Sequence, residues 1–199
     1  MSRFTVIGAG SILFLSIVWG VAFINGVYNS TNPRIQASSW INENIDPGSQ
    51  LTSQLWDDSL PIRSEFVDPA KYERVQLDLF RPDGWVDPET GVTKPELLLE
   101  QLDQSDYVIE ASNRLYDAIP RMPAKYPATS AYYRSLFSGD LGFNLVATFE
   151  NKPSLFGINL PSRGSEETFS VYDHPTVMIW EKTPNWDINK ARAILNPFA

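Results

Sequence analysis

The sequence contains no cysteine and a single histidine, His174. The lack of cysteine excludes disulfides, thiol nucleophiles and Cys-based zinc sites, and one histidine excludes a His cluster. Basic residues are also few: 16 Lys and Arg stand against 24 Asp and Glu, for a formal net charge of −8. This balance argues against general nucleic-acid binding, which needs an excess of cations. Because neither a G-x-S-x-G motif nor a phosphate-cradling glycine loop occurs, the residues indicate no self-sufficient active site, metal or cofactor.

Charge is missing altogether from one long segment. No residue from Phe4 to Val27 is charged, and the run is rich in Ile, Leu, Val and Phe. At about 1.5 Å per residue, a helix of this length crosses a hydrocarbon core of about 30 Å. Arg3 precedes the run and the next charge is Arg34, so the positive-inside rule places the N-terminus in the cytoplasm. We therefore predict a single-pass helix in the cell membrane whose main domain is extracytoplasmic.

A cleaved signal peptide is the alternative interpretation of this segment. Its apolar core would be shorter, roughly 7–15 residues, and would end at a small-x-small cleavage site. Val21-Ala22-Phe23 and Asn25-Gly26-Val27 fit such a site poorly. The expected organisation is a retained transmembrane helix with its flanks at residues 1–31 and one extracytoplasmic domain at residues 32–199.

Helical and strand patterns alternate through the rest of the chain. Strands are predicted from apolar and alternating runs at residues 50–56, 74–80, 106–111, 143–149 and 176–182. Helices are predicted from caps and apolar faces: after Asn32, after Thr93, from Thr129 or Ser130 to Gly139, and over residues 188–195. This order predicts an α/β fold, a layered domain with a mixed sheet.

The segment from Asn113 to Arg134 has an unusual composition, because four basic residues stand against one acid and are interleaved with tyrosines. A guanidinium donates two parallel hydrogen bonds to a phosphate, and a tyrosine stacks on a sugar ring. The candidate ligand-binding residues are therefore Arg114, Tyr116, Arg121, Lys125, Tyr126, Tyr132, Tyr133 and Arg134. Alternatively, the arginines pair with local acids and the tyrosines fill the core.

A second candidate site consists of Asp57, Asp58 and His174. The two aspartates follow a predicted strand, where carboxylates serve as general bases or metal ligands. Adjacent residues on an extended chain point to opposite faces, which favours a capping role for Asp57. Asp173 lies beside His174, but without a serine elbow a structural role for His174 is favoured.

Several runs of residues together resemble a known family. The runs are Asp106-Tyr107-Val108-Ile109, Ser112-Asn113-Arg114-Leu115-Tyr116, Ile119-Pro120-Arg121, Tyr132-Tyr133, Leu136-Phe137-Ser138-Gly139-Asp140-Leu141-Gly142-Phe143 and Val171-Tyr172-Asp173-His174-Pro175. The last run looks like a closing strand that continues through Val177. With them the chain resembles the C-terminal region of phospholipid-carrier-dependent glycosyltransferases, polytopic membrane proteins similar to dolichyl-phosphate-mannose protein mannosyltransferases.

This resemblance implies a sugar donor on a polyprenyl phosphate and transfer on the outer face of the membrane. It also implies that the catalytic acid lies in an early loop of a multi-helix part, so no family catalytic residue is assigned to this sequence. We expect a terminal domain, from a split or truncated transferase, that positions a lipid-linked sugar or assembles with a polytopic glycosyltransferase subunit. The alternatives are a free-standing anchored binding module and, third, a hydrolase that uses Asp57, Asp58 or His174.

Overall fold

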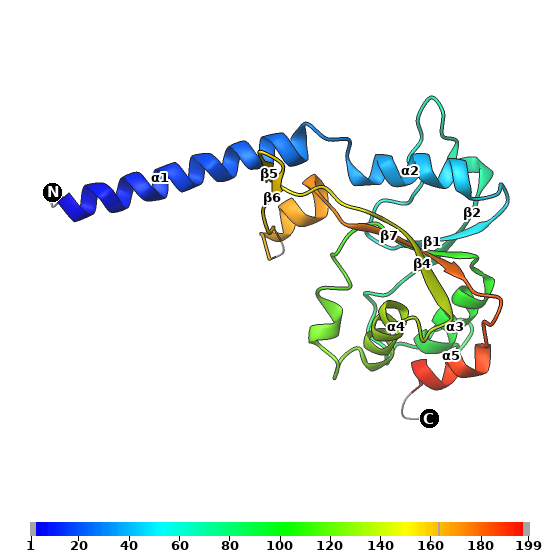
Figure 1. Ribbon diagram of the computed structural model, residues 1–199. Coiled ribbons are helices and arrows are strands. Elements are labelled where there is room, and N and C mark those ends of the chain that lie inside the picture. Colours follow the sequence, from blue (N-terminus) through cyan, green and yellow to red (C-terminus); the bar gives the residue numbers. More distant parts are fainter. Residues whose placement is uncertain (1–2, 163, 197–199) are drawn as a thin grey trace.

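The computed structural model describes residues 3–162 and 164–196. It begins with α1 (Arg3–Phe23), which continues through a π-helical turn at Ile24–Tyr28. Figure 1 shows α1 extending away from the rest of the chain as a separate rod, and most of its side chains are exposed. By length and composition this helix is apolar and long enough to cross a membrane, as its uncharged sequence predicts.

The remaining part of the chain folds around a five-stranded sheet with the order β2-β1-β3-β7-β4. Strand β1 runs parallel to β2 and β3, whereas β7 is antiparallel to β3 and β4. The predicted mixed sheet is therefore confirmed. Its strands are β1 (Gln50–Gln54), β2 (Glu73–Leu77), β3 (Tyr107–Glu110), β4 (Phe143–Phe149) and β7 (Val177–Lys182).

Helices cover both faces of this sheet (Figure 1). The alternation of β7 explains why: Val177 and Ile179 belong to one apolar cluster, and Met178 and Trp180 belong to the other. The first cluster lies under α2, and the second lies under α3, α4 and α5, so the domain has the predicted α/β layers. The helices are α2 (Pro33–Asn44), α3 (Lys94–Gln104), α4 (Pro127–Ser138) and α5 (Ile188–Leu195).

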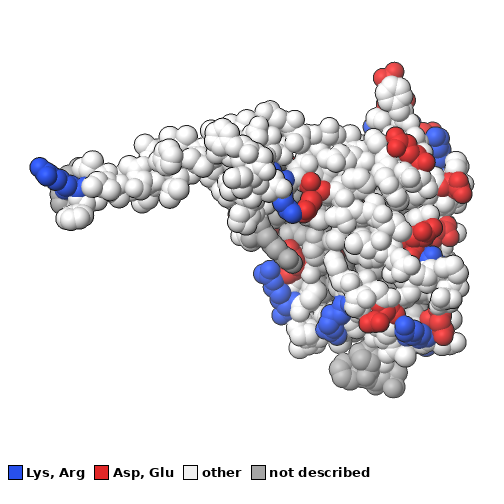
Figure 2. All heavy atoms as spheres, in the orientation of Figure 1, with Lys and Arg blue, Asp and Glu red and all other residues white. Residues whose placement is uncertain are grey.

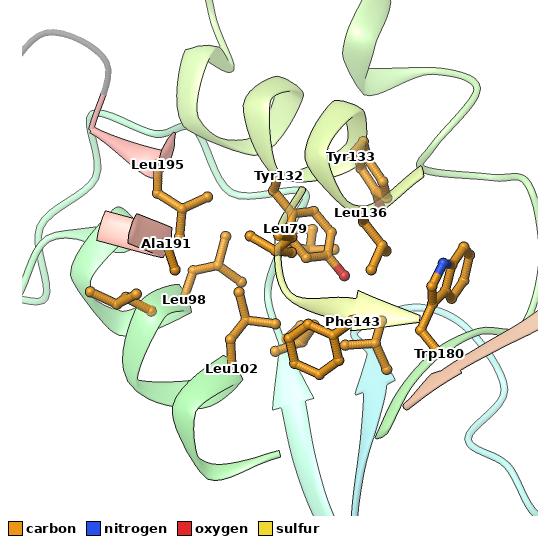
Figure 3. Packing of buried hydrophobic residues seen from close by; sticks show 14 of the residues in the cluster. Leu79, Leu98, Leu102, Tyr132, Tyr133, Leu136, Phe143, Trp180, Ala191 and Leu195 are labelled. Carbon is orange, nitrogen blue, oxygen red and sulfur yellow. The ribbon is translucent and has the colours of Figure 1, made fainter. Parts of the chain in front are cut away.

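The larger core lies between the sheet and the three helices. In Figure 3, Leu98 of α3, Leu136 of α4 and Leu195 of α5 point toward Phe143 and Trp180 of the sheet. All five side chains are almost completely buried. Burial of each such side chain contributes about 1.5–3 kcal/mol, so this core is the main source of the domain's stability.

One helix begins earlier than predicted. Helix α4 starts at Pro127 and not at Thr129 or Ser130, because proline suits the first helical position. One N–H group in its first turn has an acceptor that is distant in sequence: Thr129 N donates a hydrogen bond to Asp83 Oδ2 at 3.0 Å. The predicted end at Gly139 is confirmed, and this residue has the left-handed φ of 83° that glycine tolerates.

Two small elements escaped prediction. A hairpin joins β5 (Ser154–Leu155) to β6 (Ile158–Asn159), and a second π-helical turn spans Phe169–Asp173. The interpretation of Val171 to Pro175 as part of the closing strand is therefore wrong. The chain turns first, and the strand starts at Val177.

The end of α1 packs against this second π-helical turn. The Phe23 ring lies edge-on to His174, with ring centroids 5.1 Å apart, and 5.6 Å from the ring of Phe169. The Tyr28 hydroxyl donates a hydrogen bond of 2.9 Å to Asp173 Oδ2. The helix is thus attached to the domain through side chains that are distant in sequence.

The hairpin makes a second contact with the same end of the helix. Asn25 Nδ2 donates to the carbonyl oxygen of Ser154 at 3.1 Å. A Cβ atom at Gly26 would lie only 2.0 Å from the carbonyl oxygen of Lys152, so this close approach requires glycine. Since two elements hold the helix, α1 has a defined orientation and is not a loose tether.

Candidate functional site

A cleft of about 760 Å³ opens beside this junction. One part of its lining is the loop of Asn113, Tyr116 and Asp117, which follows the carboxyl end of the parallel strand β3. Open α/β sheets commonly bind ligands at the carboxyl ends of their strands. Ser170 and His174 contribute the lining next to α1. The fold therefore places residues about 60 positions apart around one space at the base of the helix.

Two residues that line this cleft each have a buried polar atom without a hydrogen-bond partner in the described part of the chain: Asn113 Oδ1 and His174 Nδ1. Asn113 is held in place by its amide, which donates to Asp117 Oδ2 at 2.9 Å and to Ser170 Oγ at 3.3 Å. Buried polar atoms are nearly always paired, and leaving one unpaired costs about 1–3 kcal/mol. Both atoms have almost no exposed surface, so a molecule bound in the cleft would reach them after a small rotation of the Asn113 or His174 side chain.

Burial lowers the pKa of His174, so the imidazole is neutral near pH 7. A neutral imidazole offers one donor and one acceptor nitrogen to a ligand. Its neighbour Asp173 bonds the Tyr28 hydroxyl at 2.9 Å. Asp173 and His174 therefore both contact the end of α1. They do not form the Ser-His-Asp arrangement that the hydrolase hypothesis needs.

Aromatic side chains form another wall of the cleft. The rings of Tyr116 and Phe137 lie 5.3 Å apart in an edge-on arrangement, and Phe137 also packs against Trp180 at 5.3 Å. Both Tyr116 and Phe137 line the cleft. An apolar ring beside side-chain amide, hydroxyl and imidazole groups suits a ligand with C–H faces and hydroxyls, as a hexose has.

The other predicted tyrosines lie in the core. Tyr126, Tyr132 and Tyr133 are at most 2% exposed, and Figure 3 shows the last two directed inward from α4. The Tyr132 hydroxyl donates a hydrogen bond of 3.4 Å to Glu110 Oε1, and both side chains are fully buried. These three tyrosines fill the core, as the alternative interpretation of the segment held.

The basic residues of the same segment point in several directions. Arg114 donates to the carbonyl oxygen of Trp56 and, at 2.6 Å, to the hydroxyl of Tyr172. Arg121, Lys125 and Arg134 are exposed and do not line the cleft. From the first candidate set, only Tyr116 contributes to the cleft.

The aspartates of the second candidate set form ion pairs with Arg34. Its guanidinium lies 3.1 Å from Asp57 Oδ1 and 3.5 Å from Asp58 Oδ2. Asp57 also accepts from Ser112 Oγ, and Arg34 donates to the carbonyl oxygen of Val171 at 2.9 Å. Both aspartates thus reach one cation although they are adjacent, because the chain turns at Trp56 with a φ of 74°. The cluster ties α2 to the ends of the strands.

No three His, Asp or Glu side chains gather as possible metal ligands among residues 3–162 and 164–196. Sequence reasoning singled out His174 and Tyr116 but missed Asn113, Asp117 and Ser170. Their side chains are ordinary ones, and only the tertiary fold brings Ser170 to Asn113. Comparison with protein-family models, curated proteins and solved structures finds no match to this chain.

Proposed function

We propose that the chain is a membrane-anchored module that holds the head group of a lipid-linked sugar in this cleft and does not itself catalyse transfer. The observation that carries the proposal is the position of the cleft, which opens where α1 meets the domain and is lined by Asn113 and His174, each with one unpaired buried polar atom. With α1 in a bilayer and the domain outside, a ligand at this level is within reach of lipid head groups.

The chemistry of the lining supports a sugar linked to phosphate. Asn113, Asp117 and His174 offer hydrogen bonds to hydroxyls, and Phe137 offers an apolar surface for the ring. Lys152 also lines the cleft and pairs there with Glu150, so a bound phosphate would compete with that carboxylate for its ammonium group. The resemblance to the C-terminal region of phospholipid-carrier-dependent glycosyltransferases points to the same ligand class. On this proposal the chain is the outward-facing terminal domain of such an enzyme.

Binding is measured with the full chain in lipid nanodiscs, titrated with short-chain polyprenyl phosphates that carry different hexoses. We expect saturable binding to at least one of them and weaker binding of polyprenyl phosphate alone. Replacing Asn113→Ala removes an amide of the cleft and should weaken binding about 10-fold, which corresponds to about 1.4 kcal/mol.

The matched control is Asn144→Ala, on the exposed surface of β4 and away from the cleft. This variant should bind as the unmodified chain does. Equal affinities for the Asn113 and Asn144 variants, or no saturable binding of any lipid-linked sugar, would overturn the proposal. Transfer of sugar by the isolated full chain would overturn its non-catalytic part.

A free-standing anchored binding module is the second candidate function. The composition of α1 suits it, because few side chains of the helix are polar and Ser16 bonds within the helix, to Ile12 O at 2.9 Å. Such a helix needs no neighbouring helix to satisfy polar groups. An adjacent upstream reading frame that encodes a polytopic protein lacking its last helix would favour the transferase subunit; its absence would favour the free-standing module.

A further inference from the structure

Large apolar side chains are exposed on the domain next to the end of α1. Phe156 is 92% exposed, Ile158 is 66% exposed and Phe169 is 44% exposed. The first two belong to the β5–β6 hairpin and the third to the π-helical turn at Phe169–Asp173. Exposed apolar residues that gather in one place mark a surface that binds another apolar body.

This apolar group continues the surface of α1. Figure 1 shows the hairpin beside the domain end of the helix. Asn25 bonds Ser154 at the start of the hairpin, and the Phe23 ring packs against Phe169. A lipid or protein surface that contacts the last turns of α1 would therefore also contact the hairpin.

The turn of the hairpin has an unusual residue. Phe156 and Gly157 form its two-residue loop, and both have positive φ, 52° and 81°. Asparagine is preferred at the first position of such a turn, whereas a bulky side chain with positive φ is disfavoured. Packing within the chain does not explain the phenylalanine, because its ring is almost fully exposed. An external apolar contact does explain it.

The charge distribution favours lipid as that contact. No residue from Pro153 to Ser162 is charged, and Lys152 stands at the base of the hairpin. Figure 2 shows the surface of α1 without charge between the basic residue at its free end, Arg3, and the domain, where basic and acidic groups appear. Aromatic residues and lysine at the edge of an uncharged segment are typical of the boundary between hydrocarbon and head groups.

We propose that the β5–β6 hairpin, together with Phe169, inserts into the interfacial region of the lipid bilayer beside α1. The inference rests on the proposed membrane anchor. The hairpin is a second membrane contact, so the domain cannot rotate freely about the helix. Because Asn159 of β6 also lines the cleft, insertion fixes the cleft at the level of the head groups.

The test uses the full chain in nanodiscs with one nitroxide label per variant, which is straightforward because the chain has no native cysteine. Labels replace Phe156→Cys at the hairpin, Leu13→Cys on the exposed surface of α1, and Phe66→Cys on a loop of the domain. Leu13 and Phe66 are 64% and 79% exposed in the protein alone. Collision with oxygen, which concentrates in lipid, is compared with collision with a water-soluble nickel chelate.

We expect the labels at positions 156 and 13 to collide more with oxygen and the label at position 66 to collide more with nickel. A lipid signal at position 13 with a water signal at position 156 overturns the hairpin contact and leaves the anchor intact. A water signal at position 13 overturns the anchor itself. Protection of position 156 from both reagents overturns lipid as the occupant and indicates a covering protein.

Discussion

Glu110, at the end of β3, has a fully buried carboxyl group, and no cation of the described residues pairs with it. Burial raises its pKa to about 8, from 4.5 for the free side chain. The group is therefore protonated at pH 7 in the folded chain and ionised in the unfolded chain. Its two oxygens accept hydrogen bonds from neutral donors, Gln54 Nε2 and the hydroxyl of Tyr132.

This carboxyl group makes the domain less stable as the pH rises. Between pH 4.5 and pH 8 the folded chain holds one proton that the unfolded chain has lost. The contribution is therefore complete below pH 4.5 and falls by about 1.4 kcal/mol per pH unit across this window. Glu110→Gln should remove that slope, measured by urea denaturation in detergent micelles at several pH values. The exposed Glu43→Gln variant should keep the slope; an unchanged slope in the Glu110 variant would refute the assignment.

Phe156 offers a second prediction at this scale. Phe156→Asn places the preferred residue at a left-handed position and should stabilise the domain by about 1 kcal/mol in micelles. The same change should reduce the membrane contact of the hairpin, measured as increased nickel access at a label on position 158. A stabilised variant with unchanged access at that position would contradict the proposed insertion.

At the scale of the elements, the start of α4 is bonded to a buried ion pair between Lys94 of α3 and Asp83 of the preceding loop. Lys94 Nζ lies 2.8 Å from Asp83 Oδ1, and Thr129 donates to the same carboxylate. Removing one partner of a buried pair leaves an isolated charge and costs about 3–5 kcal/mol. Asp83→Ala should lower the free energy of unfolding by that amount, whereas Arg63→Ala, which removes an exposed pair with Asp68, should cost about 1 kcal/mol or less. Similar losses in both would refute the structural role of Asp83.

The junction of α1 with the hairpin depends on Gly26. Gly26→Ala places a methyl group against the backbone at Lys152, so the hairpin must move away from the helix. We expect faster hydrogen exchange at the amides of Lys152 and Ser154, whose backbone lies against the helix at this contact. Gly20→Ala, where a Cβ meets nothing within 4 Å, should leave exchange unchanged. Equal exchange in both variants would mean that the close contact does not hold the hairpin.

Sequence patterns predicted the elements that have a regular period. The bounds of β4 and α5 were predicted correctly, because β4 is a mainly apolar run without Gly, Pro or charge and α5 has an N-cap at Asp187 and an apolar face. The two-residue strands of the hairpin are too short to show a period. The cleft was not predictable from local sequence either, since Asn113 and Ser170 are 57 positions apart and only the tertiary fold brings them together.

The composition of the Arg and Tyr segment indicated the right region but the wrong side chains for the cleft. Tyrosines that alternate with arginines look alike whether they face a ligand or a core. Helix α4 turns Tyr132 and Tyr133 inward, and only Tyr116, in the preceding loop, reaches the cleft. What decided this was the direction in which the helix packs, which the residue types alone do not specify.

At the scale of the whole molecule, the cleft, the hairpin and the exposed surface of α1 lie at one end of the domain. Two contacts with a membrane, the helix and the hairpin, would turn the cleft toward the head groups. The domain would then present a lipid-linked sugar in a fixed orientation. On this proposal, the anchor orients the cleft toward the head groups, so the two act together.

Photo-crosslinking tests this arrangement most directly. A photoreactive phenylalanine analogue replaces Phe137, which lines the cleft, in the full chain embedded in membranes that contain a radiolabelled polyprenyl-phosphate hexose. The same analogue at Phe66, outside the cleft, serves as the control. The account predicts capture of the labelled lipid at position 137 alone, and loss of that capture with excess unlabelled lipid-linked sugar. Equal capture at both positions, or capture that unlabelled ligand does not displace, would contradict it.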